Sequence, residues 1–358
     1  MSADTALDEV DYLLIAALQH APRAHWREVG AMVGVDATTA ARRWARLTGE
    51  GLAWLSCHPA PSVAGDVVTA VIEIDCVPGR LHDVCARLVD ESPLFTIEYV
   101  TGPRQLLLTA VLHSPARLAR YVAFRLEAMD GVATVRTHVV TGLHIEGSRW
   151  RIGRVRTPPK QLPVPEAAPL RELSEADRDL VFLLARDVRQ SVQQLARGAG
   201  LSPTTVRRRL ARLEAGRAIT YRCEAVRSVS GWPVYATLWA SAPAKDTARV
   251  VARLAGMRET RMCLSLSGPQ NLLATVGLRT VGDLRTFESA LTHRLPELVV
   301  HDRSLTLWQL KHAGKILDPD GRVLRAVPVI DDWHTAPTGQ AEQDLLHRLR
   351  TRAPGTRT

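Results

Sequence analysis

The feature that most restricts the fold of this chain is a long internal repeat. The first part of the sequence matches a later part without a gap, and Leu7 corresponds to Leu173, a shift of 166 positions. Residues that recur at this shift include Glu9 and Glu175, Asp11 and Asp177, Leu14 and Leu180, Arg23 and Arg189, Gly34 and Gly200, and Cys57 and Cys223. A repeat of this length indicates an internal duplication, so we expect two copies of one set of domains.

Residues 195–216, in the second copy, have the pattern of a helix-turn-helix. One short helix ends before Gly200, and the next begins with Ser202 as N-cap and Pro203 at the first helical position, where its missing N–H costs nothing. The apolar residues of that helix fall within about 60° of one another at roughly 100° per residue: Val206, Leu210 and Leu213. We expect this face to pack against the protein.

The opposite face of the same helix is expected to read DNA, because hydroxyl and cationic side chains gather there. The outward positions match in the two copies: Thr204, Thr205, Arg208 and Arg212 in the second, and Thr38, Thr39, Arg42 and Arg46 in the first. The N-cap and the flanking residues expected near phosphates are Ser202, Arg207, Arg209 and Arg43. The alternative is an ordinary solvated cationic face.

A βαββαβ pattern follows each three-helix unit. In the first copy we expect strands at 67–75, 94–101, 106–112 and 132–141, and helices at 79–90 and 115–129. In the second copy the strands are expected at 233–240, 259–267, 272–278 and 299–310, and the helices at 247–254 and 281–295. Such a unit is an antiparallel sheet with both helices on one face. The other face needs a partner, so the two sheets are expected to pack face to face.

These patterns divide the chain into six parts. We expect domains at 1–60 (first helix-turn-helix), 61–147 (first βαββαβ), 172–227 (second helix-turn-helix) and 228–314 (second βαββαβ), a linker at 148–171 and a tail at 315–358. The linker is basic and Pro-rich, and it is expected to be semi-stiff. Within the tail, residues 344–352 have the pattern of a short basic helix.

Composition excludes several classes of protein. The chain has 358 residues, 46% of them hydrophobic, and no run approaches the roughly 18 apolar residues of a membrane span. No secretory signal is visible at the start, so we expect a cytoplasmic protein. The five scattered cysteines lack a C-x-x-C spacing, which argues against a disulfide framework or a zinc site. We expect no cofactor, no metal and no catalytic residue.

Charge points to a polyanionic partner, and it is divided unequally. The net charge is +9 and the pI is about 9.8. Residues 7–59 hold five arginines against six acidic residues, a net −1, whereas residues 173–225 hold ten arginines against six acidic residues, a net +4. Because phosphate neutralisation supplies much of the affinity for DNA, we expect the second copy to dominate non-specific binding.

Several of these features together resemble the leucine-responsive/asparagine-synthesis regulator (Lrp/AsnC) family. They are Leu-x-Glu-x-Asp at the start of both copies, Gly-Leu-Ser-Pro-x-x-Val-x-x-Arg-x-x-x-Leu at 200–213, Gly231, and the βαββαβ unit. The similarity spans residues 7–145 and 173–312. It implies an α+β fold with two winged-type helix-turn-helix domains, each followed by a ferredoxin-like βαββαβ (RAM-type) domain. It also implies binding to double-stranded DNA, an amino acid or other small molecule as effector, and homo-oligomers built from intrachain pseudo-dimers.

The family often has an acidic residue in the turn between the second and third strands of the βαββαβ domain, near its effector. The corresponding turns here are Gly102, Arg104 and Gln105 in the first copy, and Gly268, Gln270 and Asn271 in the second. An ammonium group loses its carboxylate partner at these turns, whereas amides suit a neutral or different ligand. The alternative is that glycine and proline serve turn geometry alone.

Three functions follow from this resemblance. The first is a one-chain transcription factor whose halves form a pseudo-dimer, with the two third helices in successive major grooves about 34 Å apart. The second is an enzyme similar to the fused sirohaem decarboxylases, which share this architecture. Such an enzyme needs tetrapyrrole-binding histidines and arginines on the sheet, and strand 67–75 offers none, while His82, His113, His138 and His144 are dispersed. The third is an assembly partner that does not bind DNA itself.

Overall fold

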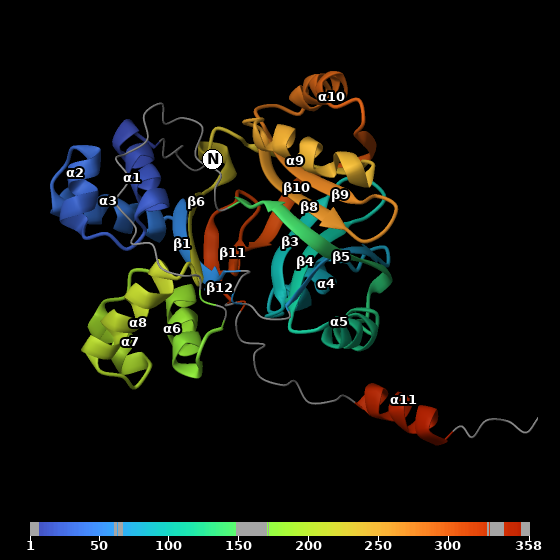
Figure 1. Ribbon diagram of the computed structural model, residues 1–358, viewed down its shortest axis with the longest axis horizontal. Helices are drawn as coiled ribbons and strands as arrows, with labels where there is room; N and C mark the ends of the chain where they lie inside the picture. Colours follow the sequence, from blue (N-terminus) through green and yellow to red (C-terminus); the bar gives the residue numbers. More distant parts are fainter. Residues whose placement is uncertain are drawn as a thin grey trace, which may run out of the picture.

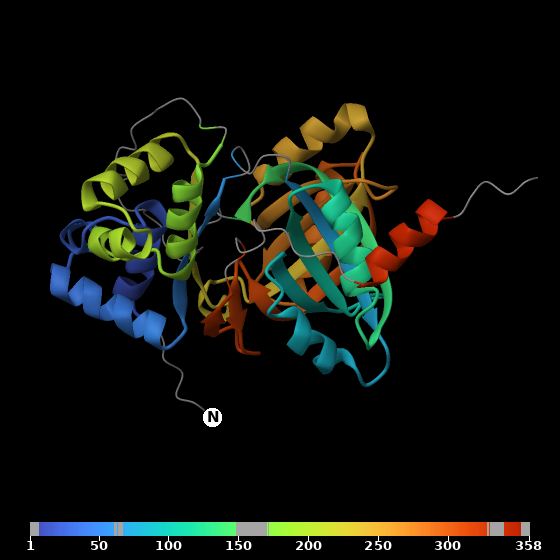
Figure 2. The ribbon, with the colours of Figure 1, turned by 90° about the horizontal axis from the view of Figure 1, so that it is seen from below.

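The computed structural model describes residues 7–60, 63, 67–147, 170, 172–327, 329 and 340–351. Helices and strands are mixed, as expected for an α+β protein. Figures 1 and 2 show two helix-turn-helix units side by side at one end of the molecule and the strands of a larger sheet at the other. The linker predicted at 148–171 lies outside the described residues except for Leu170, so the structure does not bear on it.

Each helix-turn-helix unit contains three helices followed by a strand. The first comprises α1 (Glu9–His20), α2 (Trp26–Val33), α3 (Ala37–Gly49) and β1 (Ala53–Pro59). The second comprises α6 (Glu175–Arg186), α7 (Val192–Gly198), α8 (Pro203–Ala215) and β6 (Ile219–Ala225). Gly34 and Gly200, which end the middle helices, have φ of 76° and 64°, a left-handed conformation that glycine adopts without strain.

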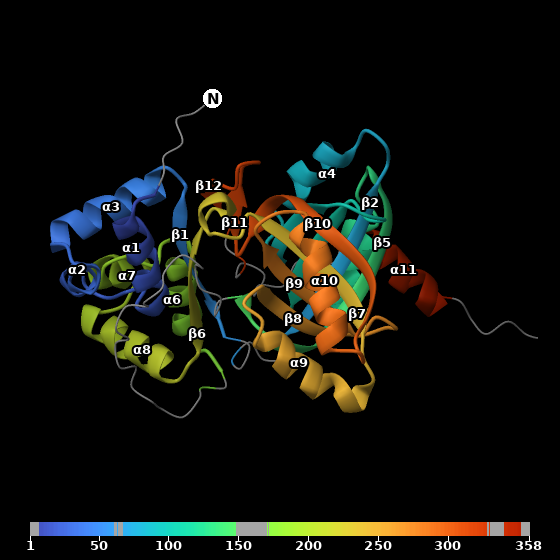
Figure 3. The same ribbon diagram turned by 90° about the horizontal axis from the view of Figure 1, so that it is seen from above.

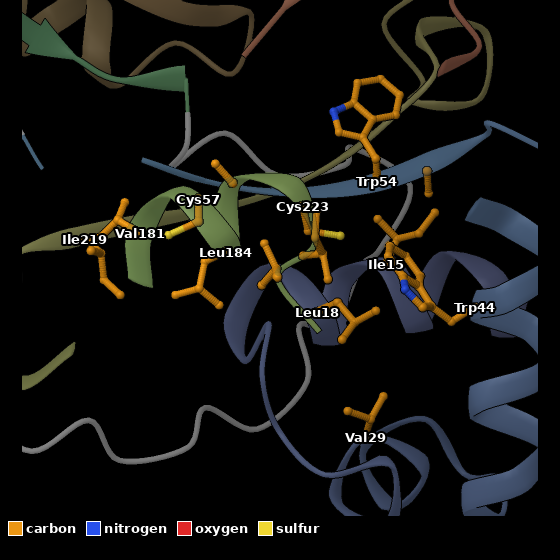
Figure 4. Close-up of a cluster of buried hydrophobic side chains, with 14 of the residues drawn as sticks. Ile15, Leu18, Val29, Trp44, Trp54, Cys57, Val181, Leu184, Ile219 and Cys223 are labelled. Atoms are coloured by element: carbon orange, nitrogen blue, oxygen red, sulfur yellow. The ribbon is translucent and has the colours of Figure 1, made fainter. Parts of the chain in front are cut away.

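Strands β1 and β6 join the two units as an antiparallel ribbon. The central residue of each strand pairs with its own repeat counterpart, Ser56 with Arg222, so the ribbon is centred on a local twofold relation. One face of the ribbon contributes Cys57, Ile219 and Cys223 to an apolar core shared by both units (Figure 4). The other face carries Arg222 and Glu224, which lie towards the larger sheet.

The larger sheet is built from the two βαββαβ segments. The first segment contains β2 (Val68–Cys76), α4 (Leu81–Leu88), β3 (Leu94–Val100), β4 (Leu106–Leu112), α5 (Pro115–Tyr121) and β5 (Val132–Ile145). The second contains β7 (Val234–Ser241), α9 (Thr247–Ala255), β8 (Thr260–Leu266), β9 (Leu272–Leu278), α10 (Asp283–Arg294) and β10 (Val299–His312). Short strands β11 (Lys315–Leu317) and β12 (Val323–Ala326) extend the sheet beside β10.

The strands of the two segments close into one ring. The hydrogen-bonded order is β10-β3-β4-β2-β5-β8-β9-β7, and β7 pairs again with β10. The closure depends on the two longest strands, because β5 leaves β2 after Val139 and pairs with β8, and β10 leaves β7 after Leu305 and pairs with β3. Both strands run past the ends predicted from the sequence, which were residues 141 and 310.

Three apolar cores support this ring. One lies between the first segment's strands and α4 and α5, and a second lies between the other strands and α9 and α10, so the helices cover the outside (Figure 3). The third lies inside the ring and joins both segments through buried residues: Val71, Val100, Leu107, Trp239, Leu264, Leu266 and Leu273. The inner faces of the two sheets therefore meet, as the sequence predicts.

The remaining helical segments differ modestly from expectation. The helix predicted at 115–129 is α5 followed by a π-helical segment at Val122–Leu126. The predicted tail helix is α11 (Gln340–Thr351), whose Glu342 carboxylate accepts a hydrogen bond from Arg120 Nε at 2.7 Å. Among the described residues, no helix combines the length and apolarity needed to span a membrane.

Candidate nucleic-acid interface and interior cavity

The third helix of each helix-turn-helix unit begins with a side-chain cap. In α8 the Ser202 hydroxyl accepts a hydrogen bond from the Thr205 amide at 3.1 Å, and in α3 the Asp36 carboxylate accepts one from the Thr39 amide at 2.9 Å. The side chains predicted to face the protein in α8 are buried: Val206, Leu210 and Leu213. The caps and the apolar face therefore fix the same helix start and orientation that the sequence predicts.

In the second unit, a buried aspartate on the first helix holds the third helix in place. Asp177 of α6 is fully buried, and its carboxylate accepts hydrogen bonds from Arg209 at 2.9 Å and from Arg212. Burial alone raises the pKa of Asp177, but hydrogen bonds from Ser174 and Arg209 hold it below its ordinary value. The ionised carboxylate is thus paired, as a buried charge requires.

The first unit repeats this arrangement. Asp11 of α1 accepts hydrogen bonds from Arg43 at 3.0 Å and from Arg46 at 2.5 Å. Four arginines of the predicted DNA-facing set therefore have partners inside their own units: Arg43, Arg46, Arg209 and Arg212. The two arginines of each pair lie three residues apart, on the side of the helix next to the first helix. Arg46 is half-buried there, whereas the Arg212 side chain is 48% exposed.

The exposed part of the predicted DNA-facing set is accordingly smaller. It consists of Thr38, Arg42, Ser202, Thr204, Arg207, Arg208 and Arg212. Thr39 and Thr205 are half-buried because their hydroxyls join the caps, with Thr39 Oγ1 donating to Asp36 at 2.7 Å. Arg42 and Arg208 occupy matching positions of the repeat, whereas the counterpart of Arg207 is an alanine. The two units thus share one exposed arginine, and the second unit also exposes Arg207 and Arg212.

Two arginines join the helix-turn-helix units by hydrogen bonds. Arg23 donates to the carbonyl oxygens of Val188 and Gln190 in the other unit. Its repeat counterpart Arg189 donates back to the carbonyls of Pro22 and Ala24, at 2.8 and 2.9 Å. Burial and the nearby charge of Arg23 lower the pKa of Arg189 to about 10. Sequence comparison paired these two arginines but gave no role to them; the structure shows that they bind the units reciprocally.

The predicted effector turns are tied to the sheet. Gly102 and Gly268 have φ of 104° and 110°, which explains a glycine in each turn. Gln105 accepts a hydrogen bond from the Cys76 amide at 2.7 Å. At the matching position, Asn271 accepts one from the Ala242 amide at 3.1 Å and donates to its carbonyl. These amides connect each turn to a neighbouring strand end, and Gln270 is half-buried beside them.

Arg104, the cation expected at the first turn, lies inside the ring. Its side chain is 5% exposed, and it donates to Glu73 at 2.6 Å and to Asp302 at 2.5 Å. His138 Nε2 lies 2.9 Å from the other oxygen of Glu73, and the Trp239 ring lies 4.8 Å below the guanidinium. Although burial raises the pKa of Glu73, His138 and Arg104 hold it below its ordinary value. Arg104 therefore neutralises a buried carboxylate in the ring interior.

A cavity of about 290 Å³ lies inside the ring beneath the β1–β6 ribbon. Its floor and one side are apolar, with Val71, Leu107, Leu143, Leu264 and Leu273. Its upper part is polar, with His58, Glu98, Arg222, Tyr235, Arg261 and His312. Apolar walls with a few convergent polar groups are typical of small-molecule sites.

The polar groups beneath the ribbon form a buried network. The Glu224 carboxylate lies 2.6 Å from His312 Nε2 and 3.1 Å from Arg261, which also donates to the Tyr235 hydroxyl at 2.9 Å. Burial opposes ionisation, but His312 and Arg261 hold the pKa of Glu224 far below its ordinary value. Burial lowers the pKa of His58 to about 3, so this ring is neutral.

These cavity residues were not predicted from the sequence. A signal was available in β6, because Thr220, Arg222 and Glu224 alternate with apolar residues and must share one face of the strand. His58, His113 and His312, which are dispersed in the sequence, all line the cavity. Among the described residues, no group of three or more potential ligands could hold a metal ion.

Comparison with solved structures shows a similar overall fold in an enzyme. The crystal structure of the sirohaem decarboxylase NirDL matches with a TM-score of 0.57, covering 96% of this chain and 100% of that one at 12% identity. The same enzyme in complex with an iron-uroporphyrin III analogue matches with a TM-score of 0.57 at 13% identity. At these identities the likeness concerns the fold alone.

Sequence comparison gives a different kind of relative. An HTH-type transcriptional regulator of Pyrococcus abyssi is 24% identical over 43% of this chain and 96% of its own length. The HTH-type transcriptional regulator Ptr1 of Methanocaldococcus jannaschii is 22% identical over 41% of this chain and 99% of its own length. The AsnC-type helix-turn-helix domain matches residues 7–48 and again 173–214, and the Lrp/AsnC ligand-binding domain matches residues 69–150. The chain therefore contains two AsnC-type helix-turn-helix domains and an Lrp/AsnC ligand-binding domain, and its sequence relatives are HTH-type transcriptional regulators.

Proposed function

We propose that this chain is a sequence-specific transcriptional regulator that binds double-stranded DNA as an intrachain pseudo-dimer. In this proposal the two ferredoxin-like βαββαβ segments stand in for the two subunits of a dimer, as products of one duplication. The observation that carries it is the local twofold relation between the units: Ser56 pairs with its counterpart Arg222, and Arg23 and Arg189 make reciprocal contacts. Two α-helices related in this way suit two half-sites of one duplex.

The reading face of the proposal is the exposed set on α3 and α8. Arg42 and Arg208 are exposed at matching positions, so both half-sites should contain a similar base pattern and the operator should be a pseudo-palindrome. Arg43, Arg46, Arg209 and Arg212 bind Asp11 and Asp177, and we assign them a role in holding the reading helices. A cytoplasmic location and association of pseudo-dimers into larger homo-oligomers are part of the same proposal.

Binding-site selection tests the assignment of Arg208. An arginine that makes two hydrogen bonds to guanine contributes about 1–3 kcal/mol of discrimination, whereas an arginine on phosphate contributes almost none. Arg208→Ala should therefore relax the preference in one half-site, and Arg42→Ala in the other. Arg207→Ala should leave the preference intact and reduce the slope of log affinity against log salt by about one. Arg253→Ala, which removes an exposed arginine from α9, is the matched control. Recovery of one unchanged site by all variants would show that the reading face is elsewhere.

A second candidate is an enzyme that acts on a tetrapyrrole, as the sirohaem decarboxylases do. The fold match over 96% of the chain and the histidines and arginines of the cavity favour it. The sequence matches to AsnC-type helix-turn-helix domains and to HTH-type transcriptional regulators oppose it. A gel shift with DNA from the upstream region of its own gene separates the two functions. Retardation supports the regulator, and no retardation together with tetrapyrrole-dependent absorbance supports the enzyme.

A further inference from the structure

The interior cavity lacks the symmetry of the repeat. Its β3–β10 side carries Glu98 and Gln309, which are hydrogen-bonded at 2.9 Å. The counterparts of these residues on the β5–β8 side are Leu264 and Leu143, which are apolar and also line the cavity. In a dimer of identical chains, a cavity on the twofold axis has two equal sides. Here one side is polar and the other apolar, so an elongated ligand would bind in a single orientation.

Arg222 at the top of the cavity has unused hydrogen-bonding capacity. The residue is 7% exposed, and its Nε is buried with no hydrogen-bond partner among the described residues. Its two terminal nitrogens lie 3.4 Å from Glu224 and 3.4 Å from Glu146, longer than the roughly 2.7–2.9 Å of a strong charged hydrogen bond. A buried donor without an acceptor is costly, and a carboxylate is the acceptor that an arginine edge fits best.

Three carboxylates lie nearby. Glu224 is bound by His312 and Arg261, Glu98 accepts from the Gln309 amide, and Glu146 lies 3.4 Å from Arg222. The buried polar atom without a partner is the Arg222 Nε, a donor, which favours an anionic ligand group over an ammonium. Phe95, whose ring lies 5.3 Å from the Arg222 guanidinium, adds an aromatic surface next to it.

The size and walls of the cavity limit the rest of the ligand. An apolar cavity of roughly 150 Å³ binds one benzene ring, so about 290 Å³ accommodates a body of about two fused rings. Val71, Leu107 and Leu273 provide an apolar floor for it. We infer that the cavity binds a monocarboxylic acid with a bicyclic aromatic or equally large apolar body, its carboxylate on Arg222 and its body towards the floor.

Calorimetric titration of the full chain with 1-naphthylacetate tests this inference. We expect one site per chain, binding at least about tenfold weaker for the neutral 1-naphthylacetamide, and no binding of 1-naphthylmethylamine. Arg222→Ser, which installs the residue found at the counterpart position 56, should weaken naphthylacetate binding at least about tenfold, and Arg222→Lys should weaken it less. Arg253→Ser should bind as the unchanged chain does.

A second variant guards against a folding effect of the Arg222 change. Val111 lines the cavity and is half-buried, so Val111→Trp fills space there without removing a polar contact. It should abolish naphthylacetate binding while the chain stays folded by circular dichroism. Equal binding of acid, amide and amine, no binding of the acid, or binding that survives Val111→Trp would overturn the inference. Tight binding of iron-uroporphyrin that naphthylacetate does not displace would overturn it in favour of a tetrapyrrole site.

Ligand binding in the cavity should also change DNA binding by the helix-turn-helix units, an expectation that rests on the proposed function. Arg222 and His58 belong to the β1–β6 ribbon, which is part of both units, so the ligand would contact the element that joins the reading helices. Gel shifts with and without naphthylacetate measure this coupling. Naphthylacetate binding without DNA retardation would count against the regulator and leave the cavity site standing. DNA retardation without naphthylacetate binding would do the reverse.

Discussion

Side-chain contacts at matching positions of the repeat are the same in the two helix-turn-helix units, whereas they differ inside the strand ring. In the units, matching positions make matching contacts, as Asp11 and Asp177 do with their two arginines each. In the ring, matching positions differ: Glu73 corresponds to Trp239, and both are buried near Arg104. At the centre of a symmetric dimer, two glutamates or two tryptophans would face each other. A single chain with two copies of the sequence repeat can place one of each there, as complementary partners.

The largest difference in the free energy of unfolding is expected between variants of the two hairpin turns. Arg104→Ala removes the guanidinium that neutralises buried Glu73, and it should lower the free energy of unfolding by about 3–5 kcal/mol. Gln270→Ala, at the counterpart position, should cost less than about 0.5 kcal/mol, as at other sites without a buried partner. Urea unfolding of both variants measures the difference. Similar losses would mean that the two turns are equivalent after all.

The next largest loss of unfolding free energy is expected to be equal in the two helix-turn-helix units. Asp11→Asn and Asp177→Asn each weaken charged hydrogen bonds to two arginines, and each should cost about 2 kcal/mol of unfolding free energy. Glu9→Gln and Glu175→Gln change exposed acidic residues two positions earlier and serve as controls. A loss confined to one of the two aspartates, measured by thermal unfolding, would break the equivalence of the units.

A smaller, pH-dependent effect should come from Lys311 near the end of β10. This lysine is fully buried, its Nζ donates to the Glu91 carbonyl at 2.7 Å, and burial lowers its pKa to about 8. Between pH 8 and the ordinary value of 10.5 the unfolded chain binds the proton and the folded chain does not, so stability rises with pH in that window. Below pH 8 the buried Lys311 is charged in the folded chain, and the full cost of that charge to the free energy of unfolding is present.

The counterpart of Lys311 in the first copy is Ile145, which supplies the matched variant. Lys311→Ile should raise the stability at pH 7 by an amount of the order of 2 kcal/mol. It should also flatten the rise between pH 8 and 10.5, as followed by urea unfolding at several pH values. An unchanged pH dependence in the variant would assign the rise to another group.

The sequence predicted local structure well because local rules govern it. The caps Ser202 and Asp36 and the apolar face of α8 follow from helix geometry, and the repeat located both helix-turn-helix units. The closure of the ring did not follow, because the pairing of β5 with β8 and of β10 with β3 joins residues far apart in the chain. Only the packed structure specifies such pairs.

The candidate site was harder to predict for a related reason. A polar residue that alternates with apolar ones in a strand indicates a solvent-facing side, yet in β6 that side covers a cavity, so Arg222 and Glu224 were missed. Arg104 follows a Gly-Pro turn, which suggests exposure, but its side chain enters the ring towards Glu73. Arg46 and Arg212 each bind a buried aspartate, a contact that the helix pattern alone does not predict.

The two halves belong to one polypeptide and pair through β1 and β6, which has a consequence for how DNA binding depends on protein concentration. A regulator assembled from separate subunits loses its second DNA-binding head on dilution, and its affinity then reflects a dimerisation equilibrium as well as DNA contact. Here both heads belong to one polypeptide and share one ribbon, so each stays at a fixed effective concentration relative to the other. Retardation of a complete operator should therefore be first order in the chain down to the lowest concentrations that can be measured.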